Sequence, residues 1–130
     1  MPGKIDWSFN VTVAGGPKFS VTRPSIPVDA YDKVDATVPK KEGAVSGTKT
    51  LDVQPSGEGK VQVLLITSSV YDDKLTYKVD GGSEVKLDEP HLLVGDGAVG
   101  LLNKTQKQFV FKNDLDKDAT VEILVGRSVA

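Results

Sequence analysis

Residues 4–14 read KIDWSFNVTVA, and this stretch indicates the fold class. Apolar side chains occupy every second position from Ile5 to Val13, and mostly polar side chains lie between them. Successive side chains of a β-strand point to opposite faces, so this period predicts a strand with one apolar and one polar face. We expect the apolar face, which includes Trp7, to be buried in the core.

Later segments extend the β pattern. VQVLLI at 61–66 carries apolar residues on both faces, which is typical of a strand that is covered on both sides. Asp80-Gly81 lies between LTYKV (75–79) and SEVKL (83–87), and Asp-Gly favours the positive φ angles of a tight hairpin turn. No segment shows an apolar stripe of helical period, so at most one or two short helical turns are expected, within 89–104.

The whole pattern predicts one all-β domain that spans residues 1–130. About nine to ten short, mainly antiparallel strands, spaced about 8–12 residues apart, are typical of a β-sandwich, either jelly-roll-like or immunoglobulin-like. Two prolines in RPSIPV at 23–28 favour extended geometry at a sheet edge or in a linker.

Composition excludes several classes of function. The chain has no cysteine, so disulfides, thiolate metal sites and thiol nucleophiles are ruled out. A formal net charge of −2 and only two arginines, Arg23 and Arg127, argue against binding to nucleic acid. No membrane-spanning segment and no secretory signal are recognisable, so a cytoplasmic protein without membrane contact is the default expectation. Release by a signal-independent route, or prior removal of a signal, stays open.

Residues 95–100, GDGAVG, match the G-x-G-x-x-G pattern of dinucleotide-binding loops. That pattern binds a pyrophosphate where a strand turns into a helix within a βαβ unit. No such alternation surrounds it here, so no cofactor is expected. We predict instead that Asp96-Gly97 forms a hairpin turn between HLLV and AVGLL.

The loop that contains Asp114, Asp116 and Asp118 has the D-x-D-x-D spacing of some calcium loops. Ala119 stands where a calcium loop of the EF-hand type has glycine, and Val125 stands where it has a bidentate glutamate. A solvated hairpin loop is therefore the favoured interpretation, with weak calcium binding as the alternative.

The aromatic residues offer few candidates for a sugar site. Tyr77 is in phase with the apolar residues of its segment and is expected in the core, whereas Tyr31 and Tyr71 are candidate platforms for a carbohydrate.

His91 is the only histidine and is expected at the surface. As a general base it would need a serine hydroxyl, such as that of Ser68 or Ser69, within hydrogen-bond reach. We expect no enzymatic activity, and a hydrolase that uses His91 is the least favoured alternative.

The favoured hypothesis is a non-enzymatic domain that binds a protein, serves as a scaffold or self-assembles as a homo-oligomer. The segments 61–66 and 91–102 carry more apolar surface than a small monomer readily buries. The predicted interface residues are Leu64, Ile66, Leu92, Leu93 and Leu101. The main alternative is a small-ligand module that binds carbohydrate or calcium between its loops.

Overall fold

The computed structural model describes residues 3–53, 60–103 and 105–128. These residues form ten strands and one short helix, and all strand pairings are antiparallel. The elements are β1 (Gly3–Thr12), β2 (Lys18–Val28), β3 (Ala30–Val38), β4 (Gly47–Asp52), β5 (Lys60–Ser68), β6 (Leu75–Val79), β7 (Val85–Lys86), β8 (His91–Val94), α1 (Asp96–Val99), β9 (Gln108–Asn113) and β10 (Ala119–Ser128). The all-β prediction is confirmed.

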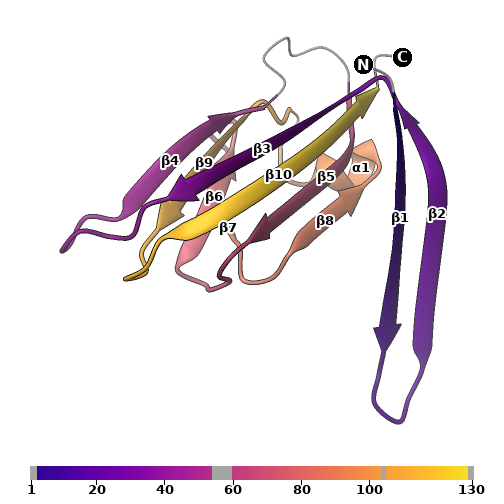
Figure 1. Ribbon diagram of the computed structural model, residues 1–130, viewed down its shortest axis with the longest axis horizontal. Coiled ribbons are helices and arrows are strands. Elements are labelled where there is room, and N and C mark those ends of the chain that lie inside the picture. The colour runs from indigo at the N-terminus through magenta and orange to yellow at the C-terminus, as the bar shows by residue number, and fades with distance from the viewer. Residues whose placement is uncertain (1–2, 54–59, 104, 129–130) are drawn as a thin grey trace.

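Eight strands form a sandwich of two four-stranded sheets, in the orders β3-β10-β5-β8 and β4-β9-β6-β7 (Figure 1). Within the eight, the first strand pairs with the last, the second with the seventh, the third with the sixth, and the two middle strands with each other. A long antiparallel hairpin of four such pairs, wrapped into two layers, produces this order, which is that of a jelly roll. The jelly-roll alternative is thus the one observed, and the immunoglobulin strand order is not.

The core lies between the two layers and follows the alternation of the sequence. Val121, Ile123 and Val125 of β10 are all fully buried, whereas Glu122 between them is exposed. The largest buried side chains are aromatic, and the Tyr77 ring lies 5.5 Å from that of Phe111. The prediction that Tyr77 belongs to the core is confirmed.

The strand β5 is covered along its core face, and its outer face is covered at Val63 but open at Leu65, so the cover predicted on both sides holds for only part of the strand. Leu64 and Ile66 are fully buried in the main core. Val63 points to the opposite face and is also buried, because the base of the β1–β2 hairpin covers it. The apolar residues on the two faces of β5 therefore pack against two different layers, the opposite sheet on one side and the base of the β1–β2 hairpin on the other.

Two predicted turns have different outcomes. Asp80 has φ 49° and Gly81 has φ 74°, and the Gly82 amide donates to the Val79 carbonyl at 2.9 Å, so the predicted hairpin is confirmed. The hairpin predicted at Asp96-Gly97 is wrong, because these residues begin the single helical turn α1. The Val99 and Gly100 amides donate to the carbonyls four residues earlier, which closes a helix rather than a two-residue turn.

The strands β1 and β2 stand apart from the sandwich as a two-stranded hairpin, hereafter the arm (residues 3–28). Figure 1 shows the arm leaving the end of the sandwich where β10 finishes and extending well beyond it. The expectation that Trp7 lies in the core is therefore wrong: Trp7 is half-buried on the arm. The two prolines of 23–28 lie in β2, which pairs with β1 alone within the described residues, as an edge position requires.

The only helix in the described part of the chain is four residues long, and none there has the length and hydropathy of a membrane span.

Candidate functional site

The arm has one apolar and one polar face. Residues directly opposite each other in an antiparallel pair share a face, and Phe9 pairs with Val21 while Val11 pairs with Phe19. This face is uncovered toward the tip, where Phe9 is 40% exposed and Phe19 is 58% exposed. Val11 and Val13 are 47% and 50% exposed. The arm thus exposes a row of large apolar side chains to solvent, away from the core of the sandwich.

The polar face of the arm carries the alternate residues. Of these, Lys4, Asp6, Ser8, Asn10 and Thr12 come from β1. The Ser20 hydroxyl donates to the Asn10 side-chain oxygen across the two strands. Since solvent satisfies such groups, the apolar face is the side of the arm that requires cover.

Trp7 links the base of the arm to its exposed tip. Its ring stacks on Phe9, with centroids 5.8 Å apart and an interplanar angle of 5°. The Trp7 indole nitrogen is buried and has no hydrogen-bond partner among the described residues. Trp7 is also the only tryptophan of the chain, so its fluorescence reports on the arm alone.

The base of the arm is seated on the outer face of the β3-β10-β5-β8 sheet at Gly126. A Cβ atom at this position would lie 2.5 Å from Cδ1 of Ile5, 3.2 Å from Cγ1 of Val28 and 3.7 Å from Cβ of Val63. Ile5 and Val28 therefore pack against a surface that is open only because residue 126 has no side chain.

Polar contacts fix the connection between the arm and β3. The Asp29 amide donates to the Arg127 carbonyl at 2.8 Å. The Arg127 guanidinium donates to the Asp32 carboxylate at 3.0 Å, and both side chains are at least two-thirds shielded from solvent. Arg127 thus ties the end of β10 to the start of β3, where the arm departs.

The outer face of this sheet continues beyond the arm as an apolar row. In the register of the four strands, Leu124 lies opposite Lys33 and Leu65, and Leu65 lies opposite Leu92. Leu92 is 39% exposed, and Leu65 and Leu124 are half-buried. Lys33, Leu65, Thr67, Glu122, Ile123 and Leu124 line a shallow depression of about 130 Å³ on this face.

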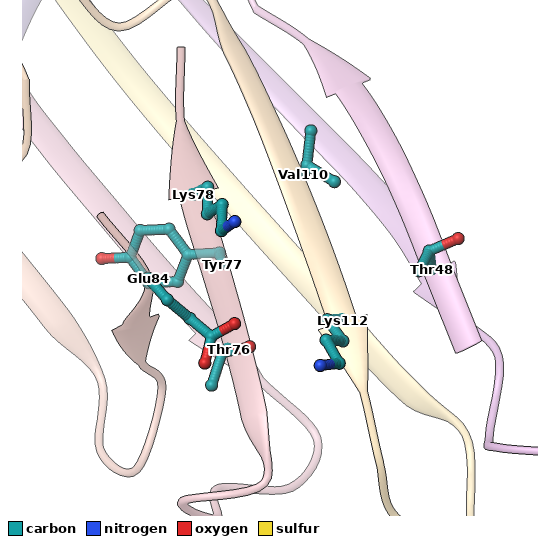
Figure 2. Close-up of a pocket in the computed structure, with 7 residues that line it drawn as sticks. All are labelled: Thr48, Thr76, Tyr77, Lys78, Glu84, Val110 and Lys112. Atoms are coloured by element: carbon teal, nitrogen blue, oxygen red, sulfur yellow. The ribbon is translucent and has the colours of Figure 1, made fainter. Parts of the chain in front are cut away.

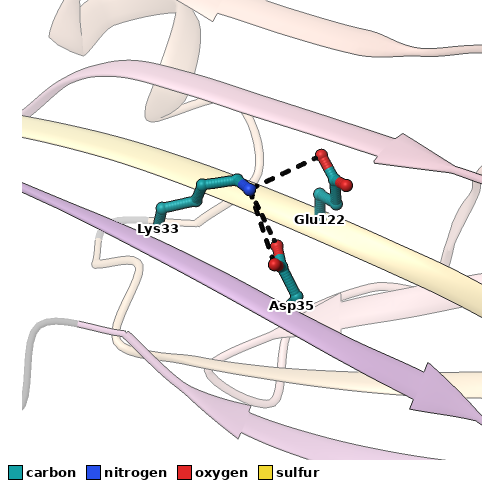
Figure 3. Close-up of polar contacts among 3 residues, drawn as sticks. All are labelled: Lys33, Asp35 and Glu122. Carbon is teal, nitrogen blue, oxygen red and sulfur yellow. Dashed lines mark hydrogen bonds and ion pairs between the residues drawn. The ribbon is translucent and has the colours of Figure 1, made fainter.

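Charged side chains border the row. The Lys33 ammonium lies 3.4 Å from Asp35 and 4.0 Å from Glu122, and Figure 3 shows it between the two carboxylates. All three side chains are more than half exposed, so these ion pairs contribute little to folding stability.

The opposite sheet has a shallow depression of about 180 Å³ on its own outer face (Figure 2). Its lining includes two ammonium groups, from Lys78 and Lys112, and one carboxylate, from Glu84. The remaining lining residues are Thr48, Thr76, Tyr77 and Val110. Charged side chains therefore border this depression, as they border the one on the first sheet.

The aspartates of the loop after β9 point to different partners. Asp114 accepts a hydrogen bond from the Ser46 hydroxyl at 2.9 Å, and Asp118 accepts one from the Lys40 amide at 2.9 Å. Asp116 is exposed. Within the described ranges, no group of three or more acidic or histidine side chains is placed to hold a metal ion.

A buried asparagine that the sequence analysis missed organises this loop. Asn113 is fully buried, and its amide group donates to the carbonyls of Val38 at 3.2 Å and Lys117 at 2.9 Å. Its side-chain oxygen accepts from the Leu115 amide at 2.9 Å. An asparagine at the start of an acidic loop is the sequence feature that could have revealed this role.

His91 bridges the two sheets instead of lying at the surface, which corrects the expectation from sequence. Its Nδ1 and the Tyr77 hydroxyl oxygen are 2.7 Å apart, and the residue is half-buried. Burial lowers the pKa of His91, and the Asp88 carboxylate opposes that shift. Burial also raises the pKa of Tyr77.

The two candidate serines contact backbone groups rather than His91. The Ser68 hydroxyl accepts from the Val70 amide at 3.3 Å, and the Ser69 hydroxyl accepts from the Thr120 amide at 2.9 Å. Within the described part of the chain, the partner of His91 is a phenol. His91 is therefore hydrogen-bonded to neither Ser68 nor Ser69.

The two candidate sugar platforms lie apart. Tyr31 is 52% exposed and pairs with Gly126, at the end of the sheet where the arm departs. The Tyr71 hydroxyl accepts from the Ser68 amide at 3.0 Å, and Ser68 pairs with Val121 near the other end of β10. The carbohydrate and calcium alternatives stay predictions.

The predicted interface residues divide into two groups. Leu64 and Ile66 are completely buried in the core and present no surface, so β5 can offer only Leu65 and its neighbours on the outer face. Leu93 is half-buried and packs against the core, whereas Leu92 and Leu101 are exposed, Leu101 by 83%.

Comparison of the sequence with known proteins finds no family model and no curated protein that matches this chain.

Proposed function

We propose that this protein is a non-enzymatic, self-assembling structural domain, and that its arm is the element through which copies associate. Jelly rolls serve in shells, in sugar-binding domains and in other proteins, so the fold by itself does not select a function. The observation that carries the proposal is the uncovered apolar face of the arm.

The energetics of a hairpin support this role. A two-stranded hairpin alone is marginally stable in water, and it gains stability when an apolar face packs on another layer. Among the described residues, only the base of the arm has such a layer, at Val63 and Gly126, whereas Phe9, Val11 and Phe19 are 40%, 47% and 58% exposed. Association would supply the missing layer.

The backbone edges of the two strands of the arm also favour association between copies. Within the described residues, β1 and β2 pair only with each other, so each has one edge that no other strand covers. A monomer that holds out both an apolar face and two open edges is prone to bind other chains.

Sedimentation velocity over a wide concentration range tests the proposal. We expect the wild-type protein to form oligomers and a variant that carries both Phe9→Ser and Phe19→Ser to be monomeric. The double variant should keep the circular dichroism spectrum of the sandwich, because neither side chain belongs to the core. A wild-type protein that remains monomeric at the highest attainable concentration would refute the proposed function.

A further inference from the structure

We propose that the arm of one copy binds the outer face of the β3-β10-β5-β8 sheet of a second copy, in a two-fold dimer that exchanges its two arms. This inference rests on the proposed self-assembly and identifies the surface that receives the arm. The receiving surface is the apolar row of Leu124, Leu65 and Leu92.

Continuity with an existing contact supports this choice. The same face already holds Ile5 and Val28 of the chain's own arm, at Gly126 and Val63. The apolar row lies two residues farther along each strand, about 7 Å away. The tip of the chain's own arm leaves its row uncovered, because the arm extends away from the sandwich (Figure 1).

The depression beside the row matches an aromatic side chain in size. It measures about 130 Å³ and includes Leu65 and Leu124 in its lining. A benzene ring occupies an engineered cavity of about 150 Å³, so a ring of the size of Phe9 or Phe19 suits this shallow depression. Both phenylalanines lie on the apolar face of the arm and are exposed.

Charge complementarity favours a contact between arm and body over a contact between two arms. Residues 1–28 contain three basic side chains, Lys4, Lys18 and Arg23, and one acidic side chain, Asp6. Of the 16 basic and 18 acidic residues in the chain, the remaining 13 and 17 therefore lie in residues 29–130. Two positive arms repel each other, whereas a positive arm is attracted to a negative body.

The area that can be buried favours a dimer in which each copy binds the arm of the other. The part of the arm beyond its base is about seven residues long and extends about 24 Å, and two strands are about 10 Å wide, so its apolar face covers about 240 Å². One arm on one sheet buries about 480 Å² in total, whereas two exchanged arms bury about 960 Å², which approaches the ~1,000 Å² that a specific interface requires. A two-fold axis provides both contacts at once.

A complementation experiment tests the pairing. Phe19→Asp places a charge on the apolar face of the arm, and Leu65→Lys places one in the receiving row. We expect each variant alone to dimerise about 100-fold more weakly than wild type, as for loss of a central interface residue. An equimolar mixture should associate at least about 10-fold more tightly than either variant, because one intact arm then meets one intact row.

Matched controls carry the same charges on faces that the dimer leaves free. Thr12→Asp lies on the polar face of the arm, and Thr50→Lys lies on an exposed position of the opposite sheet. Both should dimerise as wild type does. Circular dichroism and melting establish that each variant folds, and Leu92→Lys on the edge strand β8 replaces Leu65→Lys if that variant does not.

The outcomes separate the two proposals. A monomeric wild type refutes self-assembly itself. If wild type dimerises and Phe19→Asp does not, but the Leu65→Lys and Leu92→Lys variants that fold still dimerise, self-assembly through the arm stands and the receiving row is wrong. Two monomeric variants whose mixture also stays monomeric would show that an intact arm and an intact row do not restore the contact, and the inference would be refuted.

Discussion

Gly126 lies directly beneath Ile5, so that a Cβ atom at residue 126 would be 2.5 Å from Cδ1 of the isoleucine. The contact joins the arm to the last strand of the jelly roll, although the two residues are near opposite ends of the chain. The packing of the arm on the sheet is therefore sensitive to one methyl group added at residue 126 or removed at residue 5.

Gly126→Ala should lower the free energy of unfolding by about 1–3 kcal/mol, because the added methyl overpacks this contact. Ile5→Val removes the Cδ1 atom that the new methyl meets, so the double variant should be more stable than the sum of the single effects predicts. Urea denaturation of the four proteins measures this coupling. Gly97→Ala is the control, since a Cβ there meets nothing within 4 Å and should not destabilise the protein. Strictly additive changes at residues 5 and 126 would contradict the seat described here.

Asp80→Asn should destabilise the protein at neutral pH by about 1 kcal/mol, after allowance for solvent screening. Partial burial raises the pKa of Asp80, but hydrogen bonds from the Thr105 hydroxyl and from the Lys107 and Gln108 amides outweigh it, and the pKa is lowered. The ionised carboxylate therefore stabilises the fold above its ordinary pKa of 3.8, and this contribution is lost as the pH falls through the lowered value.

Urea titrations at neutral and at strongly acidic pH check this expectation. The difference between wild type and Asp80→Asn should shrink below about pH 4, where the wild-type carboxyl takes up its proton. Asparagine also tolerates the positive φ of this turn, so a pH-independent loss of stability would mean that the charge is not the cause.

Because of His91, acidification should also lower the folding stability in a second pH range, separate from that of Asp80. Since burial lowers the pKa of His91 below 6.5, the unfolded chain binds this proton more readily, and stability falls as the pH drops below about 6.5. His91→Gln should lose this part of the pH dependence. Melting temperatures from pH 7.5 down to pH 5 provide the measurement, and an unchanged slope in the variant would assign the effect to other groups.

Asn113→Ala should cost about 3 kcal/mol of unfolding free energy, because it leaves the buried partners of its side chain without hydrogen bonds. Asp116→Ala in the same loop should change the stability by less than about 0.5 kcal/mol, since that residue is exposed. Chemical denaturation compares the two. Equal effects of both substitutions would show that the loop does not depend on Asn113.

Millimolar calcium should leave the melting temperature unchanged. Asp114 and Asp118 already accept hydrogen bonds from Ser46 and Lys40, which lie in the connection between β3 and β4. A ligand that binds only the folded state at about 100 times its Kd would add about 2.7 kcal/mol of stability. A rise in melting temperature that is lost in Asp116→Ala would instead establish the calcium alternative.

Local features of the sequence were enough to predict much of the fold. Asp80-Gly81 predicted its hairpin because the positive φ angles of that turn are a property of two adjacent residues. The doubly apolar segment 61–66 predicted a strand covered on both sides, and β5 is covered along its core face and, on its outer face, at Val63. By contrast, Asp96-Gly97 formed a helical turn, because the same residues suit more than one tight conformation and the surrounding chain selects between them.

The nested pairing of the jelly roll could not be predicted from the sequence. Its first strand, β3, pairs with its last strand, β10, and almost all of the sandwich lies between them in the sequence. The bond between His91 and Tyr77 and the seat of Ile5 on Gly126 are likewise contacts between distant segments. Such contacts depend on which strands become neighbours, and a strand's own residues do not contain that information.

The sequence by itself determined that residues 5–12 form a strand with one apolar face. Only the tertiary structure decided that this face lies on an arm outside the core, and that Phe9 and Phe19 are exposed while Tyr77 is not. The physical reason is that a two-residue period records which side of a strand avoids water, whereas the layer that covers that side is supplied by other parts of the chain or, as we propose, by a second copy.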